Sequence, residues 1–234
     1  MSSFSFPSRS ACWLITYLGG HPEWRAKAAS EIEFLLESTP YSSDISQPLS
    51  SRLSTIPLDV WESSTPVLDA IIRETTRIAQ PHTAMRRNIG PEIYINNKII
   101  PTGAYVIYPF SDVHLDPEIY PDPWKFDPGR RVPEKTPFSY VGWGGGMWMC
   151  ALFLVASSTK ISYFSGKTMC LGTRLAKVEL KLVTAMFILG FQHSVVDKSG
   201  APLNPLPTPN WNDILFARPQ QGSFTKYERT SLPL

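Results

Sequence analysis

Apolar residues recur at helical spacing in the first part of the chain. Residues 11–20 form an apolar stretch that starts so near the N-terminus that we expect a helix whose chain continues upstream. A second helix is predicted to begin near Pro22, since proline costs nothing in the first helical turn. Its apolar face repeats at intervals of four, four and three residues. The positions are Trp24, Ala28, Ile32 and Leu35. The Ser- and Pro-rich residues 39–54 are predicted to form a loop.

A third helix is predicted to start at Thr65-Pro66, where threonine suits the N-cap and proline the first helical position. Its apolar side is lined by Val67, Leu68, Ile71, Ile72 and Ile78. Glu74 falls on that side at about 100° per residue, and Arg77 lies at its edge, within reach of Glu74. A buried glutamate needs such a partner, because an unpaired buried charge is very costly. The pattern leaves a second interpretation open, an ordinary surface pair.

The clearest helical pattern covers residues 171–191. The expected inner stripe is Leu175, Val178, Leu182, Met186 and Leu189. The expected outer positions are Arg174, Lys177, Lys181 and Gln192. A turn at residues 197–200, an extended segment at 202–209 and a polar tail should follow.

Between the helices the pattern changes to short strands and irregular chain. Residues 93–95 and 104–108 are β-like runs separated by Asn and Pro-Gly turn residues, which suggests a small sheet. Residues 111–131 mix acidic, proline and aromatic residues without a period, so we expect a meandering segment with no regular element. The predicted fold class is mainly α with small β-sheets.

Composition excludes several classes of function. A net charge of +2 with scattered basic residues offers no surface for nucleic acid. Three Cys and four His without regular spacing argue against a disulfide framework or a zinc site. Residues 1–10 are polar and contain no secretory signal, and the apolar runs 151–156 and 186–189 are too short to cross a bilayer.

The main chemical signal is a glycine- and cysteine-containing stretch in two pieces, residues 137–146 and 167–174. Joined together, the two pieces give one pattern. It is an aromatic residue, any two residues, a glycine, any three residues, a cysteine, any one residue, a second glycine, and then a helix. Such a loop can present a cysteine thiolate, because backbone N–H groups and a helix N-terminus stabilise its negative charge. The twenty residues between the pieces, 147–166, do not belong to the pattern.

Three motifs in this order resemble the cytochrome P450 family of haem-thiolate monooxygenases, specifically its C-terminal half in a fungal-type member. The motifs are Glu74-Thr-Thr-Arg77, the segment from His114 to Arg130, and the cysteine loop. The resemblance extends from about Ala11 to the tail. It implies the C-terminal part of the cytochrome P450 fold, with residues 1–234 as a partial, N-terminally truncated domain.

The resemblance gives roles to several residues outside the loop. Glu74 and Arg77 correspond to the ExxR pair of the family, and Arg130 to the arginine that completes a three-residue ionic cluster. In the family this cluster holds the meander on the helix and helps to form the haem-binding core. For a glutamate on an apolar helix face, two arginines would supply the partners that its burial requires.

Other residues would contact the cofactor, a haem (heme) group. Arg86 or Arg87 stands where the family often places a partner for a haem propionate, which a guanidinium can bind bidentately. Gly146 and Gly172 would let the backbone approach the porphyrin. His114 occupies a family-typical position without an evident chemical role.

Two cysteines compete for the role of iron ligand. Cys170 is favoured because Gly172 and a strong helix follow it. Cys150 keeps the upstream half of the motif, but Leu152 stands where glycine is expected. A thiolate ligand donates electron density to haem iron and favours O–O cleavage. Cys12, like the cysteine that is not the ligand, is expected to be a buried, inert thiol.

Residues 147–166 are interpreted as an insertion, and we hypothesise a translated intron. Their removal leaves Gly-Trp-Gly-Gly-Gly-Lys-Thr-Met-Cys-Leu-Gly, which has the uninterrupted spacing of the family. A loop that lies flat against a porphyrin has little room for the extra residues.

The resemblance implies O2-dependent hydroxylation of a small organic substrate, with an NADPH-dependent reductase as electron donor. Full-length members of this type are usually held at the endoplasmic reticulum membrane by an N-terminal helix, and we expect residues 1–234 to contain no such anchor or other targeting segment. We also expect the helix that carries the oxygen-activating residues of the family to be missing or reduced to its last turns. We therefore assign no catalytic residue and expect little or no catalysis.

Two alternatives remain. One is a non-catalytic remnant of the family, from a pseudogene or a misassembled gene. The other is a phosphate-binding protein, since residues 142–146 could form an anion nest and Gly166-Lys-Thr168 mimics the end of a P-loop. That motif needs glycine where Ile161 stands.

Overall fold

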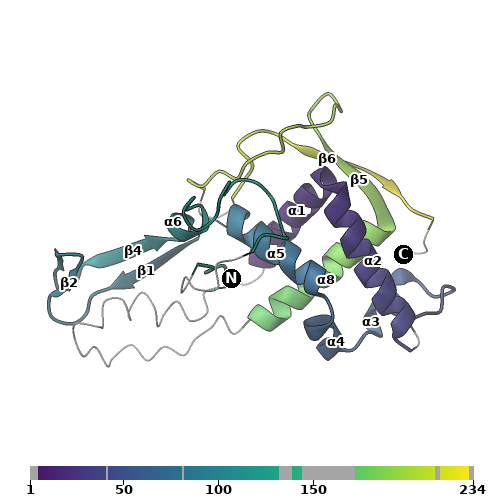
Figure 1. The fold of residues 1–234 in the computed structure, drawn as a ribbon, viewed down its shortest axis with the longest axis horizontal. Helices are drawn as coiled ribbons and strands as arrows, with labels where there is room; N and C mark the ends of the chain where they lie inside the picture. The colour runs from purple at the N-terminus through teal and green to yellow at the C-terminus, as the bar shows by residue number, and fades with distance from the viewer. Residues whose placement is uncertain are drawn as a thin grey trace.

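The structure is a computed structural model that describes residues 5–40, 42–80, 82–131, 139–143, 172–213 and 217–231. Helices dominate it and the strands are short, which confirms the expected fold class (Figure 1). In chain order the elements are α1 (Ser5–Gly20), α2 (Pro22–Ser38), α3 (Leu49–Ser54), α4 (Leu58–Ser63), α5 (Pro66–Ala79), β1 (Thr83–Arg87), β2 (Ile93–Ile95), β3 (Lys98–Ile100), β4 (Tyr105–Pro109), α6 (Ser111–His114), α8 (Thr173–Gly190), β5 (Phe191–Val196) and β6 (Phe224–Arg229).

The hydrophobic core lies where the long helices α1, α2, α5 and α8 meet. Helix α1 contacts α5, α8 and β5, while α2 contacts α5 and α8. Each helix contributes fully buried aliphatic side chains, and burying one of these stabilises the fold by about 1.5–3 kcal/mol. Examples are Leu14, Ile32, Ile71 and Leu180. Helix α5 runs through the middle of this assembly, so its side chains meet partners from several other elements (Figure 1).

Helix α5 starts where the sequence predicts, but a different helix caps it. The hydroxyl of Thr65 donates to the carbonyl of Trp61 at 2.8 Å and therefore does not serve as the expected side-chain cap. The Glu31 carboxylate on α2 accepts the N–H groups of Val67 at 2.7 Å and Leu68 at 2.9 Å. These two bonds pair amides of the α5 N-terminus, where a helix carries partial positive charge, and they join α5 to α2.

Helix α8 has nearly the predicted bounds, but its buried face differs from the expected one. Leu175, expected inside, is 65% exposed, whereas Lys181, expected outside, is 1% exposed. The Lys181 ammonium lies 3.0 Å from the carboxylate of Asp69 on α5 and donates to the carbonyl of Trp61 at 2.8 Å. The other four predicted inner residues belong to the core or pack against it. A polar contact, as well as apolar packing, therefore determines how α8 docks on α4 and α5.

The described strands form three antiparallel pairs, β1–β4, β2–β3 and β5–β6. Both predicted strands are present, as β2 and β4, but they belong to different pairs. The turn between β2 and β3 uses Asn96 and Asn97 at φ of 47° and 62°, a conformation that asparagine tolerates better than most residues. The β1–β4 ribbon extends away from the helices and carries β2–β3 at its far end (Figure 1).

The structure differs from the expected irregular regions in three places. Residues 39–54 contain α3, whose Leu49 and Leu53 are buried in the core. Residues 111–131 begin with the short helix α6. The polar tail contains β6, which pairs along β5 with Phe191 opposite Arg229. Tertiary contacts support these short elements, because local propensity alone is too weak to do so.

Helix α1 is bonded to the last part of the chain. The Trp13 indole N–H donates to the carbonyl of Ala217 at 2.9 Å, and His193 on β5 lies 3.0 Å from the carbonyl of Ile15. A mostly apolar cavity of about 780 Å³ adjoins these contacts, and Cys12 lines it. Cys12 is exposed, so the expectation of a buried thiol is wrong there. Among the described helices, none has the length and apolar character needed to cross a membrane.

Candidate functional site

The ion pair predicted on α5 is buried. Glu74 is 4% exposed and Arg77 is 1% exposed. The Arg77 guanidinium donates through Nε to Oε2 and through Nη2 to Oε1, each at 2.8 Å. This bidentate geometry is the strong form of an arginine–carboxylate contact. The buried interpretation is therefore confirmed, and the surface interpretation is wrong.

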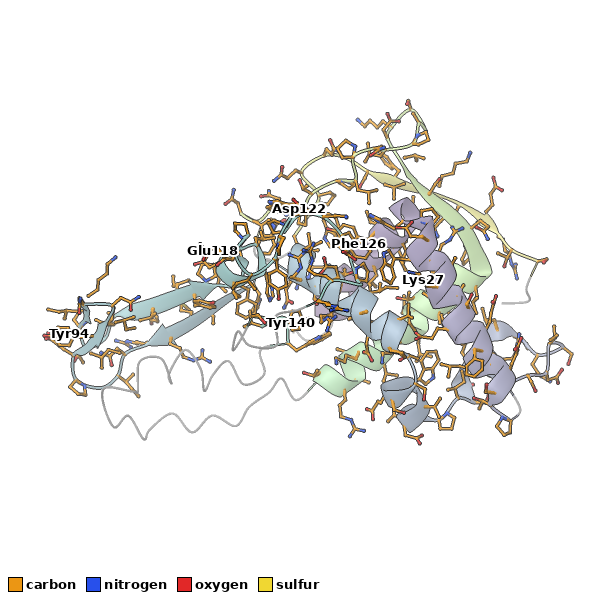
Figure 2. The ribbon with its side chains drawn as sticks, in the orientation of Figure 1. Lys27, Tyr94, Glu118, Asp122, Phe126 and Tyr140 are labelled. Carbon is orange, nitrogen blue, oxygen red and sulfur yellow. The ribbon has the colours of Figure 1, made fainter. Side chains whose placement is uncertain are left out.

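Arg130 joins the same carboxylate from the meander. Its Nε lies 3.4 Å from Oε1 of Glu74, and the N–H of Asp127 donates to that oxygen at 3.1 Å. Arg130 also donates to three backbone carbonyls of the segment before it. The acceptors are Pro121, Asp122 at 3.1 Å and Lys125 at 3.0 Å. The expected three-residue cluster is thus present, and it fastens residues 121–130 to α5. Figure 2 shows Asp122 and Phe126 beside this helix.

The cluster continues from Arg77 toward the start of the cysteine loop. Nη1 of Arg77 donates to the carbonyl of His114 at 2.6 Å. The Arg77 guanidinium also lies over the ring of Tyr120, 4.7 Å from its centroid, in a cation–π contact. The Tyr120 hydroxyl in turn donates to the carbonyl of Ser139 at 2.6 Å. Residues 139–143, the described part of the loop, therefore start next to the ionic cluster.

Two further bonds fix the direction of the loop. The hydroxyl of Thr76 donates to the Ile72 carbonyl at 2.9 Å, so the Tyr140 hydroxyl, 2.5 Å from it, is the donor in their contact. The N–H of Val141 donates to Nε2 of His114 at 3.0 Å. Figure 2 shows Tyr140 close to α5 and far from the tip of the β ribbon, which Tyr94 marks.

His114 acquires a chemical role that the sequence did not assign to it. A backbone N–H can only donate, so Nε2 carries a lone pair and the proton of the neutral ring is on Nδ1. Burial, and after it the Arg77 guanidinium, lower the pKa of His114 to about 3. Nδ1 has no hydrogen-bond partner among the described residues.

After the bonds of Tyr140 to Thr76 and of Val141 to His114, the loop continues through Gly142 and Trp143. A Cβ on Gly142 would lie 2.3 Å from the hydroxyl of Tyr140, which is buried and bonded, so glycine is required there. The Trp143 ring lies 5.9 Å from the ammonium of Lys177 on α8. At the other end of the loop, Gly172 is the N-cap of α8 and has no side chain to cover the first-turn amides. Trp143 from the first piece of the loop and Gly172 from the second therefore both lie near the first turns of α8.

The remaining predicted residues of the loop lie outside the described part of the chain. These are the favoured ligand Cys170, its alternative Cys150, Gly146 and the insertion 147–166.

Arg86 and Arg87 occupy neighbouring positions on β1 and therefore point to opposite faces of the β1–β4 ribbon. Nη1 of Arg86 donates to the carbonyl of Met85 at 2.6 Å, and Nε of Arg87 donates to the carbonyl of Gly103 at 3.2 Å. The Arg87 guanidinium also lies 5.7 Å from the ring of Tyr105. Since their directions are opposite, only one of the two arginines can face a given ligand.

Some residues of the site carried no sequence signal. Tyr140 and Thr76 are separated by 64 residues, and nothing in their own surroundings predicts that they meet. Lys181 looked like a solvated position because it is charged. His114 differs from these residues, because its place in a motif drew attention to it. The motif did not indicate that its side chain binds the Val141 N–H.

Comparison with known proteins identifies the family. The family model described as Cytochrome P450 matches residues 8–223. The cytochrome P450 monooxygenase AacuE of Aspergillus aculeatus is 30% identical over 197 residues, which is 81% of this chain and 35% of that protein. The cytochrome P450 monooxygenase dmxR5 of Cryptosporiopsis sp. is 30% identical over 191 residues, 80% of this chain and 33% of that protein. This chain thus spans about a third of the length of these relatives.

A solved structure agrees with this assignment at the level of the fold. Retinoic acid-bound cyanobacterial CYP120A1 superposes with a TM-score of 0.61 at 24% identity, covering 97% of this chain and 43% of that chain. The chain therefore shares its fold with part of a known P450 structure. Since the family match extends over residues 8–223, the chain belongs to the cytochrome P450 family.

Proposed function

We propose that the chain is the C-terminal portion of a haem-thiolate monooxygenase of fungal type, with Cys170 as the iron ligand. The observation that carries the proposal is the anchoring of the cysteine loop. Residues 139–141 are bonded to the Glu74–Arg77–Arg130 cluster and its neighbours, and Gly172 begins α8 at the other end. A haem with thiolate-bound iron supplies the oxidation, while the protein supplies the ligand, the pocket and the orientation of the substrate.

The described residues fit a negatively charged ligand atom in front of α8. The first turn of this helix contains no acidic residue, and its N-cap is a glycine. Helix N-termini lower the pKa of nearby cysteine thiols, and their partial charge stabilises an anion by about 0.3–1 kcal/mol. Cys170 stands two residues before Gly172 in the sequence, which suits this effect.

The finer parts of the proposal follow from the family. Either Arg86 or Arg87 would hold a haem propionate, Gly146 and Gly172 would face the porphyrin, and Glu74, Arg77 and Arg130 would support the binding core. The full-length protein would hydroxylate a small organic substrate at the endoplasmic reticulum membrane, with electrons from an NADPH-dependent reductase. These features are proposed for the full-length protein, because the curated relatives are more than twice as long as this chain.

The insertion remains part of the proposal. Residues 147–166 separate the two halves of the ligand loop, and their removal restores the family spacing. We expect a spliced transcript to lack the corresponding codons. Sequencing mature messenger RNA tests this, and a message that retains all of them would refute the intron hypothesis.

A haem-binding experiment tests the function. The full chain, and the same chain without residues 147–166, would be expressed, supplied with haem, reduced and exposed to carbon monoxide. We expect the shortened chain to give the red-shifted Soret band of a thiolate-ligated haem and the full chain to give little of it. Cys170→Ser should abolish the band in the shortened chain. If the full chain gives the band and Cys150→Ser removes it, Cys150 is the ligand; if neither chain binds haem through sulfur, the proposal fails.

The same experiment distinguishes a second candidate, a non-catalytic member of the family. A chain that binds haem but shows no substrate oxidation with an added reductase would support this candidate. Phosphate binding receives no support from the family match.

A further inference from the structure

His114 forms hydrogen bonds in two directions. Its backbone carbonyl accepts Nη1 of Arg77 at 2.6 Å, and its side-chain Nε2 accepts the N–H of Val141 at 3.0 Å. The same residue therefore contacts the ionic cluster on α5 and the first residues of the cysteine loop. It stands at the end of α6 and is 0% exposed, so water does not compete for either bond.

The imidazole ring is held in its orientation by aromatic neighbours. Tyr140 stacks on it at a centroid distance of 5.3 Å and an interplanar angle of 21°, and Phe110 meets it edge-on at 6.2 Å. Tyr140 is itself bonded to Thr76 on α5. The Val141 side chain packs with Phe110 in a small buried cluster. Nε2 therefore points at one fixed place, where the backbone of the loop passes.

We infer that His114 is a positioning residue for the ligand loop: its neutral imidazole accepts the Val141 N–H and so sets the direction in which the loop enters Gly142. The inference rests on the proposed function in one respect, that this loop carries the iron ligand. His114 does not touch a reacting atom in this arrangement. It acts through the backbone of the loop.

The alternative is that His114 merely fills space beside Tyr140. The two roles differ in what the side chain must supply, an acceptor atom in one case and a flat ring in the other. His114→Phe keeps the ring but has no acceptor. His114→Gln loses the ring but can place its amide oxygen near the position of Nε2, which makes the two variants a matched pair.

Hydrogen exchange at the Val141 amide measures the bond directly. Selective ¹⁵N-valine labelling of the full chain reports Val141 together with Val178, a buried residue of α8 that serves as an internal reference. Loss of the acceptor leaves a buried donor unpaired, so we expect His114→Phe to raise the exchange rate of Val141 relative to Val178 by about tenfold or more. His114→Gln should return the ratio to near the wild-type value. Dividing by the reference removes any effect of general destabilisation.

The Soret band of the reduced carbon monoxide complex measures the consequence for the ligand. In the chain without residues 147–166 and at saturating haem, His114→Phe should reduce the red-shifted fraction of the band, and His114→Gln should restore it. His114→Gln, which also removes the ring, serves as the control for a general loss of stability.

The outcomes are distinct. An unchanged exchange ratio in His114→Phe overturns the inference, and so does a ratio in His114→Gln that is as high as in His114→Phe. If the red-shifted fraction in His114→Phe equals that of wild type, the inference is also overturned, because the bond between His114 and Val141 would then have no effect on the iron ligand. If neither the full chain nor the chain without residues 147–166 shows a red-shifted band, the proposed function fails, while the exchange ratio still decides whether His114 positions the loop.

Discussion

Replacing Glu74 by glutamine tests the central ionic cluster. The substitution keeps the size of the side chain and removes its charge. Arg77, 2.8 Å away and 1% exposed, would then carry a buried charge without a carboxylate. The amide group of glutamine would also face donors, because Nη2 of Arg77 and the N–H of Asp127 both point at the present carboxylate.

The size of the effect follows from this burial. Breaking a buried ion pair by removing one partner costs about 3–5 kcal/mol, which is a large part of the roughly 5–15 kcal/mol that stabilises a whole domain. Urea unfolding with a slope of about 3 kcal/mol per molar would then show a midpoint lowered by about 1–2 M. Combining Glu74→Gln with Arg77→Met should cost less than the sum of the single changes, since the two residues interact.

The chain offers a matched control. Glu62 binds Arg174 with the same bidentate geometry, at 2.7 Å for both bonds, but the Arg174 side chain is 77% exposed. Water screens such a pair, so Glu62→Gln should leave the midpoint unchanged within error. If Glu74→Gln shifts the midpoint no further than Glu62→Gln does, burial of the cluster does not have the energetic consequence argued here.

Three further predictions concern other parts of the helical core. Asp69→Asn should destabilise the chain more than Lys181→Met, because the first leaves a buried ammonium without its carboxylate and the second removes that ammonium; urea midpoints in the opposite order would contradict this. Arg130→Lys should increase proteolysis in the segment between α6 and residue 130 without loss of helical circular dichroism, since one ammonium cannot replace a guanidinium that bonds Glu74 and three carbonyls; unchanged cleavage would count against it. Burial raises the pKa of Glu31 despite its bonds to two α5 amides, so its contribution to stability is full below the unfolded pKa of about 4.3 and declines as pH rises through the raised native pKa. Glu31→Gln should remove that decline from urea midpoints measured between about pH 4 and 7, and a variant that retains it would refute the assignment.

Local periodicity predicted the parts of the fold and site that depend on one helix at a time. Glu74 and Arg77 lie three apart on one helix, so the sequence could show both their pairing and the apolar face on which they stand. Arg130 could be added only through the resemblance, because 56 residues separate it from Glu74. The expected roles of Cys170 and the loop around it stay predictions.

The parts that failed depend on contacts between distant elements. A lysine in a helical pattern is ordinarily solvated, and only the approach of Asp69 and of the α4 backbone makes Lys181 a buried residue. Similarly, β6 consists entirely of exposed residues and gains its order from pairing with β5. Capping of α5 by Glu31 instead of Thr65 belongs to the same class, since the carboxylate comes from another helix.

The bond from Trp13 to Ala217 has a consequence for synthesis of the chain. The two residues are 204 positions apart, and α1 also packs on α8 and β5 near the C-terminal end. At about 5–20 residues per second, a ribosome needs roughly 10–40 s to extend the chain from one partner to the other. Throughout that interval the apolar face of α1 is without its final neighbours. We therefore expect newly made α1 to depend on chaperones, and its packing to be completed only after residue 217 has been synthesised, late for a largely helical protein.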